Sequence, residues 1–165
     1  MTVRPVLRYP DPVLKRRADP VGAAAEHPGL ASDLVDTMRA GPATVGLAAP
    51  QIGVSLRAFC LDVSGHRRAS TSHGLVVLLD PEVVETDGQE VLREGCLSVP
   101  DLTANVRRAA RVVVRGWSAD GREVVYRMEG FEARALQHEL DHLEGRLILD
   151  RVDSAGDVFP RKVYR

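Results

Sequence analysis

The stretch from residue 130 to 145, GFEARALQHELDHLEG, constrains the fold more than any other part of the chain. Its apolar residues recur with the period of an α-helix, and Gly145 is the kind of residue that usually turns the chain past a helix end. At about 100° per residue, His138 and His142 point to the same side of this helix. A second stripe is apolar and contains Leu136, Leu140 and Leu143. Only the remaining arc is polar enough to face water, and it holds Arg134, Gln137, Asp141 and Glu144.

The five residues from 138 to 142 form the pattern HExxH. It places two imidazoles one helical turn apart, with Glu139 between them as a carboxylate that can take a proton from metal-bound water. The alternative for so short a pattern is a helix with two ordinary surface histidines. Burial of most of the helix disfavours that alternative, because unpaired buried polar groups cost several kcal/mol. A catalytic metal site also needs a third protein ligand beside an open position.

Cys96 is the best candidate for the third ligand. It follows a glycine at the end of a predicted strand, and a thiolate binds Zn(II) or Fe(II) well. Glu94 and Asp62 compete, but Glu94 would give a site of a different type and Asp62 lies within a predicted strand. The other interpretation of Cys96 is an inert core residue. For Cys60, which lies in the apolar run 58–61, the inert core residue is the favoured interpretation.

Strands dominate the rest of the chain. The sequence predicts an irregular arm over residues 1–20 and an amphipathic helix over residues 27–39. The predicted strands cover residues 56–63, 75–84, 89–93, 112–117 and 123–128. Three histidines lie outside these elements or at their ends and are expected to face solvent: His27, His66 and His73.

Length and charge narrow the class of protein. A chain of 165 residues is expected to form one domain over residues 1–165. Its formal net charge of -1 gives no global field that would favour nucleic acid or a membrane surface. We find no apolar run of signal-peptide or membrane-spanning length and therefore expect a cytoplasmic protein. Two cysteines are too few for a disulfide framework.

Residues 46–51, GLAAPQ, surround one amide side chain with small residues. Small residues permit close approach of the backbone to a ligand or to a neighbouring strand. The alternative is a tightly packed loop in which Gln51 is a solvated cap, and this stretch alone does not decide between the two.

Three stretches read together closely resemble the signature motifs of the peptide deformylases: GLAAPQ (46–51), EGCLS (94–98) and QHELDH (137–142). The resemblance extends over most of the chain, and three independent motifs in one order argue against coincidence. It implies an α+β fold with antiparallel β-sheets packed around a long central helix. It also implies an Fe(II) ion, with Zn(II), Ni(II) or Co(II) as substitutes, and removal of the formyl group from nascent polypeptides that begin with formyl-methionine.

The resemblance further implies roles for single residues. The metal ligands would be Cys96, His138 and His142. Glu139 would take a proton from the metal-bound water as this water attacks the formyl carbon, and would then pass it to the leaving amine. The Gln51 amide and the backbone N–H of Leu97 would hold the developing oxyanion.

On the substrate side, the resemblance implies that the backbone of Gly46 pairs with the extended peptide. The pocket for the methionine side chain would be lined by Val45, Leu92, Phe131 and Ala135. The last two share the helical stripe of the histidines. Arg108 would pair with Asp141 and steady the helix.

One position departs from the resemblance, because the family usually has a glycine where this chain has Thr44. If the backbone there needs a positive φ, threonine would be strained by about 1 kcal/mol or more. A deformylase paralogue with altered substrate or inhibitor preference is therefore a competing interpretation.

Two further interpretations differ in the chemistry. An HExxH metallopeptidase would draw its third ligand from beyond the helix, where the carboxylates are Glu144, Asp150 and Asp153. A non-catalytic relative that binds metal or peptide would show damaged motifs, and these motifs are intact. As partners we expect N-formyl-methionyl nascent peptides in transient proximity to the ribosome, with no direct contact to nucleic acid or membrane.

Overall fold

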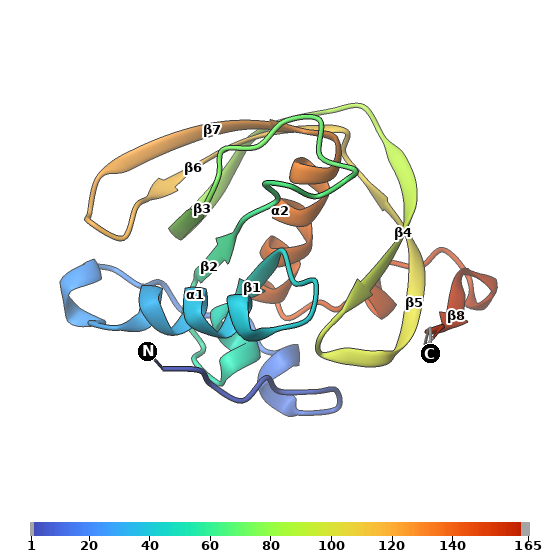
Figure 1. Ribbon diagram of the computed structural model, residues 1–165, viewed down its shortest axis with the longest axis horizontal. Coiled ribbons are helices and arrows are strands. Elements are labelled where there is room, and N and C mark those ends of the chain that lie inside the picture. Colours follow the sequence, from blue (N-terminus) through green and yellow to red (C-terminus); the bar gives the residue numbers. More distant parts are fainter. Residues whose placement is uncertain (1, 163–165) are drawn as a thin grey trace.

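The computed structural model describes residues 2–162 and shows one long helix enclosed by strands (Figure 1). The α-helices are α1 (Leu30–Ala40) and α2 (Gly130–Leu143). The strands are β1 (Gly46–Ala48), β2 (Ala58–Leu61), β3 (Val76–Asp87), β4 (Glu90–Cys96), β5 (Val99–Arg108), β6 (Arg111–Trp117), β7 (Glu123–Glu129) and β8 (Val158–Pro160). Short 3-10 helices, among them Ala49–Ile52, occur in the connections. Across residues 2–162, no helix has the length and apolar character needed to span a bilayer.

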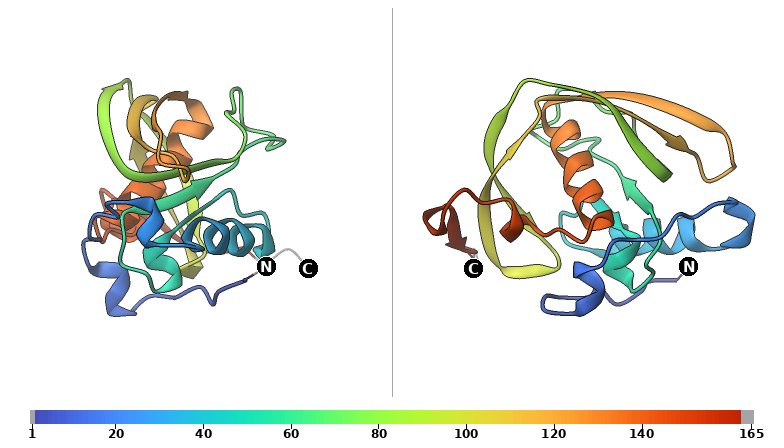
Figure 2. Two further views of the ribbon diagram at one scale, coloured as in Figure 1. Left: turned by 90° about the vertical axis from the view of Figure 1, so that its left-hand side faces the viewer. Right: turned by 180° about the vertical axis from the view of Figure 1, so that it is seen from behind.

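The strands form two antiparallel sheets. The larger has the order β1-β2-β3-β6-β7 and the smaller the order β4-β5-β8. In the views of Figure 2, α2 runs between the two sheets. This arrangement confirms the predicted α+β fold with antiparallel sheets around a central helix.

Apolar side chains fix α2 between the sheets. On one side, Leu136 and Leu143 pack in a buried cluster with residues of β2, β3 and β6, which include Phe59, Leu78 and Val114. On the other side, the chain that follows α2 packs Leu147 and Ile148 against Ala104 and Val106 of β5. Helix α1 covers β1 and β2 through Leu34 and Met38. Because the helix is buried from both sides, its position relative to both sheets is fixed.

Several boundaries differ from the prediction for local reasons. Helix α1 begins at Leu30 because Gly29 adopts a left-handed φ of 86° directly after Pro28. Strand β5 was not predicted. The last of its buried positions is occupied by a charged residue, Arg108, so the sequence does not show the alternation of apolar and polar residues that indicates a strand.

The polar arc of α2 does not face water as expected. Arg134 is 4% exposed and Asp141 is 5% exposed, because the smaller sheet covers this arc and supplies charged partners. Two loop histidines also have partners. The His66 ring stacks on Phe131 with a centroid distance of 4.0 Å, and His73 Nδ1 lies 2.8 Å from Glu132 Oε1. The prediction that these rings simply face solvent was therefore incomplete.

Gly145 ends the helical segment as predicted, with a φ of 71°. It also allows a close approach, because a Cβ atom placed on it would lie 2.7 Å from the Lys15 carbonyl carbon and oxygen. The neighbouring hydrogen bond from Ala18 N–H to Leu143 O, at 2.9 Å, holds the N-terminal arm against the end of α2. The arm and the end of α2 are thus joined at a position where a side chain does not fit.

We predict that Gly145→Ala destabilises the protein more than Gly121→Ala does. Gly121 also has a positive φ, of 82°, but nothing lies within 4 Å of its Cβ position. Gly121→Ala should therefore cost only the left-handed strain of about 1–2 kcal/mol. Gly145→Ala should cost at least about 1 kcal/mol more, because the arm must move. Urea unfolding measures both, and equal losses would show that the close approach has no energetic weight.

Candidate metal centre

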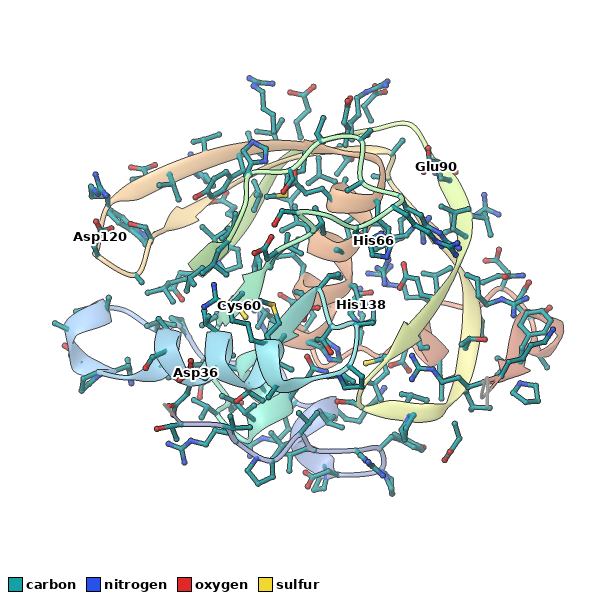
Figure 3. All side chains as sticks on the ribbon, in the orientation of Figure 1. Asp36, Cys60, His66, Glu90, Asp120 and His138 are labelled. Atoms are coloured by element: carbon teal, nitrogen blue, oxygen red, sulfur yellow. The ribbon has the colours of Figure 1, made fainter. Side chains whose placement is uncertain are left out.

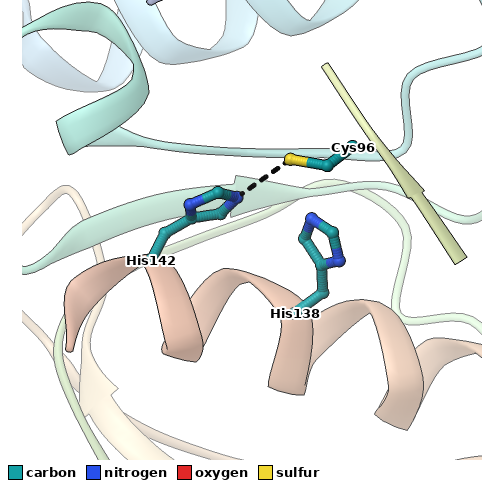
Figure 4. Close-up of side chains that lie close together, drawn as sticks. All are labelled: Cys96, His138 and His142. Atoms are coloured by element: carbon teal, nitrogen blue, oxygen red, sulfur yellow. Dashed lines mark hydrogen bonds between the residues drawn. The ribbon is translucent and has the colours of Figure 1, made fainter. Parts of the chain in front are cut away.

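Three side chains converge between β4 and α2. Cys96 ends β4, and His138 and His142 lie one turn apart on α2 (Figure 4). The ligand atoms of all three lie within 4.8 Å of one another, and Cys96 Sγ is 3.4 Å from His142 Nε2. The sulfur predicted from the middle of the chain therefore meets both nitrogens of the HExxH helix.

A buried carboxylate, Glu94, orients this group. Its Oε1 accepts hydrogen bonds from Arg108 Nε and Arg134 Nη1, each at 2.7 Å. Its Oε2 lies 3.0 Å from His138 Nδ1. A proton on Nδ1 leaves Nε2 of His138 as the nitrogen that can bind a cation. Burial opposes the charged form of Glu94, but the hydrogen bonds from Arg108 and His138 outweigh it and lower the pKa of this carboxyl.

The same arginine ties the smaller sheet to the helix. Arg108 Nη1 lies 2.7 Å from Asp141 Oδ2, so one guanidinium on β5 bridges Glu94 on β4 and Asp141 on α2. Arg151 Nη2 lies 2.6 Å from Asp141 Oδ1. Glu94 was considered as a metal ligand, but its contacts make it the partner of a ligand instead.

The electrostatic setting favours a thiolate at Cys96. Burial alone would keep the thiol protonated, but the charges of His142 and His138 outweigh this effect and hold the pKa of Cys96 well below its ordinary value. Cys60 shows the opposite behaviour, because burial, together with the charge of Glu139, raises the pKa of its thiol. Cys60 is a buried core residue of β2, as predicted.

Gln51 is held with its amide nitrogen toward the sulfur. It lies in the 3-10 helix Ala49–Ile52 and is buried. Its Oε1 accepts a hydrogen bond from Ala48 N–H at 3.0 Å. Its Nε2 donates to Ser98 Oγ at 3.1 Å and lies 3.8 Å from Cys96 Sγ. Because the oxygen is already occupied, the donor end of the amide faces the metal centre, so Gln51 is not a solvated cap.

Glu139 is buried beside Gly46. A Cβ atom placed on Gly46 would lie 2.5 Å from Glu139 Oε1, so the missing side chain makes room for the carboxylate. Burial raises the pKa of Glu139. Its Oε2 has no hydrogen-bond partner within residues 2–162. A buried acceptor without a donor costs free energy, which suits a carboxylate that faces a reacting water molecule.

A cavity of about 230 Å³ opens above these residues. Besides Cys96 and His138, the predicted site residues that line it are Val45, Gly46, Gln51, Leu97, Phe131, Ala135 and Glu139. Leu92 does not line it, and its side chain is 42% exposed. Leu92 lies on β4 next to Arg93, which does line the cavity, so a place for Leu92 beside the methionine side chain stays a prediction.

Other residues at the cavity were not predicted. They include Pro42, Ala43, Arg93, Gly95, Arg134 and Arg161. Ala43 has a φ of 50°, whereas Thr44 is not among the residues with positive φ. The positive φ that was considered for Thr44 therefore occurs at Ala43 instead. The sequence carried no signal for Arg161, which lies far from every motif in the chain.

The donor set fits a divalent cation. One thiolate and two imidazoles are ligands typical of Zn(II) and Fe(II), and three protein ligands leave a coordination position for water or substrate. The carboxylate on Nδ1 of His138 is the outer partner that such ligands usually have. The residues present are therefore suited to hold the metal.

An HExxH helix that faces a strand-end cysteine inside an α+β fold defines a metal-dependent hydrolase. The sequence model described as Polypeptide deformylase matches residues 3–157. The chain belongs to the polypeptide deformylase family, whose members are metal-dependent enzymes that remove the formyl group from nascent peptides.

Relatives match over nearly the whole chain. A peptide deformylase from Syntrophobacter fumaroxidans is 43% identical over 164 residues, covering 98% of this chain and 94% of that protein. The crystal structure of peptide deformylase from Thermotoga maritima has a TM-score of 0.83 at 36% identity and covers 93% of this chain and 100% of the other. A Met-Ala-Ser-bound structure of the class I type b peptide deformylase from Acinetobacter baumannii has a TM-score of 0.80 at 35% identity, with 92% and 99% coverage.

We predict that Arg108→Ala costs about 3–5 kcal/mol of unfolding free energy, because it leaves buried carboxylates short of a partner. The adjacent Arg107→Ala is the matched control. Arg107 pairs with Asp153, and both side chains are more than half exposed, so its loss should cost no more than about 1 kcal/mol. Urea denaturation of both variants tests this, and similar losses would contradict a structural role for the buried network.

Proposed function

We propose that this chain hydrolyses the formyl group from N-formyl-methionyl nascent peptides in the cavity between β1 and β4. The observation that carries the proposal is the convergence of Cys96, His138 and His142 beside Glu139 and the donor end of Gln51. The assignment rests on this geometry together with the family to which the chain belongs.

The metal would be held by Cys96, His138 and His142. We propose Fe(II) as the native ion, with Zn(II), Ni(II) or Co(II) as substitutes, because a thiolate with two imidazoles suits each of these borderline ions. When bound, the cation would activate a water molecule as the nucleophile and polarise the formyl oxygen. Metal analysis after anaerobic purification would identify the ion.

Glu139 would move the proton. Its carboxylate lies next to Gly46, and Glu139 lines the cavity together with Cys96 and His138. It would accept a proton from the attacking water and deliver it to the amine nitrogen as the C–N bond breaks. Formate and a free methionyl amine would be the products, so atoms and charge balance.

Gln51 and Leu97 would stabilise the oxyanion. Gln51 Nε2 is aimed at the metal centre by the hydrogen bond that Ala48 N–H donates to its oxygen. Leu97 follows Cys96 directly and lines the same cavity, so its backbone N–H is the second donor that we propose. Each such donor is typically worth about 2.7–4 kcal/mol in the transition state.

Two sheet edges would hold the peptide. Strand β1 is the last strand of the larger sheet and β4 the last strand of the smaller one, and residues of both line the cavity. An extended peptide could pair with Gly46 as an added strand, with its methionine side chain beside Val45, Phe131 and Ala135. The Acinetobacter baumannii relative has a structure with Met-Ala-Ser bound, which supports a methionyl peptide as ligand of this chain.

A metallopeptidase or a non-catalytic relative is less consistent with the site. The downstream carboxylates that a metallopeptidase would use have other partners, since Glu144 pairs with Arg57 and Asp150 with Lys15. A non-catalytic relative would not need Glu139 or the aligned Gln51. A paralogue with altered preference would be distinguished by Thr44, which lines the cavity.

We further propose that the substrate is met in the cytoplasm, close to the ribosome and without direct contact to nucleic acid or membrane. The near-neutral formal charge of -1 supports this, because no global positive field would draw the protein to polyanions.

Formate release from formyl-Met-Ala-Ser tests the function. The wild-type protein should release formate, and Glu139→Gln should reduce kcat by at least about 10²-fold because the proton acceptor is lost. Metal content should stay unchanged, since Glu139 is not among the proposed ligands. Full turnover in the variant would remove Glu139 from the mechanism, and no formate from the metal-loaded wild type would reject the function.

Gly46→Ala should impair catalysis without removing the metal. The new methyl group would displace the Glu139 carboxylate, and a displacement of about 1 Å can cost about 10²-fold in rate. Gly156→Ala is the control, because its Cβ position meets only Ser154 Oγ at 3.5 Å. Normal kcat in Gly46→Ala would show that the contact with Glu139 is tolerant.

A further inference from the structure

Two guanidinium groups at one end of the cavity have no part in the proposed chemistry. Arg93 lies on β4, and Arg161 follows β8, at a position beyond the residues 3–157 that the family model matches. Figure 3 shows the side chains of this region around the small sheet. Both arginines line the cavity that contains the metal group.

Arg161 lies directly on the strand that ends at the metal centre. Its backbone N–H donates to Asp101 O at 2.8 Å, which extends the pairing of β8 with β5. A Cβ atom on Gly95 would lie 2.7 Å from Arg161 Nη2 and 3.3 Å from Cζ. The guanidinium therefore occupies the space that a side chain at residue 95 would fill, one residue from Cys96.

Arg93 is held on the same face of the small sheet. Its Cζ lies 3.5 Å from the centroid of the Phe159 ring, and its Nε donates to Asn105 Oδ1 at 3.0 Å. Residues 93 and 95 alternate to one side of β4, as do Phe159 and Arg161 on β8. The two cations thus share one surface beside the cavity.

The charges of this pair are not balanced locally. Glu94, a carboxylate beside them at the cavity, is already paired with the buried Arg108 and Arg134, each at 2.7 Å. Within residues 2–162, neither Arg93 nor Arg161 forms an ion pair with a carboxylate. Arg161 is exposed, so its forked donors are available to a ligand.

We infer that Arg161, assisted by Arg93, is a specificity-determining residue that binds a carboxylate in the part of the peptide that follows the formyl-methionine. This inference rests on the proposed function, because it takes the peptide to run from the metal centre along β4. An acidic side chain in the second to fourth position would meet Arg161 there. Nascent chains with an early Asp or Glu would then be processed faster than chains with the corresponding amides.

Matched peptides test the inference. Formyl-Met peptides of four residues with an amidated C-terminus would carry Glu or Gln in the second, third or fourth position. The wild type should show about a two- to five-fold higher kcat/KM for Glu at one or more positions, as expected for an exposed ion pair. The difference should lie in KM, with kcat unchanged, and should shrink as ionic strength rises from about 0.05 to 0.5 M. A Gln peptide with a free C-terminal carboxylate in place of the amide shows whether Arg161 binds the end of the peptide chain instead of an acidic side chain.

The variants assign the preference to one residue. Arg161→Gln should abolish the Glu preference and Arg161→Lys should keep part of it. Arg122→Ala, which removes an exposed arginine of the β6–β7 turn, should leave it unchanged. Equal kcat/KM for Glu and Gln at all positions, a preference for the terminal carboxylate alone, or equal losses for both peptides in Arg161→Gln would overturn the inference. Competition by the deformylated Glu and Gln peptides gives their affinities without turnover, so failure of the inference is distinguishable from failure of the proposed function.

Discussion

The structure depends on one buried carboxylate, that of Glu94. It stands between two arginines and His138, a proposed metal ligand, and it is the point at which β4, β5 and α2 are connected. Such a network is a poor source of stability, because removing charges from water costs several kcal/mol per ion before their attraction repays it. Its value is geometric. It fixes the ring of His138 and the separation of β4 from α2, and Cys96 lies two residues further along the same strand.

Fixing β4 against α2 also explains why the cavity exists. The helix lies between the two antiparallel sheets (Figure 1), and β1 and β4 are each an outermost strand with residues at the cavity. Open edges invite pairing with other chains. Here β1 is only three residues long, and β4 carries the charges of Glu90 and Arg93. The short β1 and the charged β4 limit strand pairing to a short peptide. A site that acts on the first residues of a polypeptide needs no longer pairing.

The sequence predicted the parts of the fold and site that depend on periodicity or donor chemistry. The spacing of His138 and His142 requires a shared helix face, and Cys96 offered a soft ligand at a strand end before that helix, whereas Cys60 lies within an apolar run. The burial of Arg134, the role of Glu94 and the stacking of His66 were not predictable, because each depends on a partner distant in the chain. The place of Leu92 in the methionine pocket stays a prediction, because a motif gives order along a strand but not the direction in which the strand leaves the site. Arg161 lies outside every motif. It comes close to Gly95 because β4 and β8 both pair with β5.

The two cysteines show that burial alone does not determine the chemistry of a thiol. Cys60 and Cys96 are both buried, yet the pKa of Cys60 is raised and that of Cys96 is lowered. Cys60 faces the thioether of Met38, with the two sulfur atoms 3.6 Å apart, and the charge that shifts its pKa most is that of the Glu139 carboxylate. Cys96 faces two imidazoles. A cation therefore finds a thiolate at only one of these positions, and the neutral Cys60 thiol does not compete for it although both cysteines belong to the protein core.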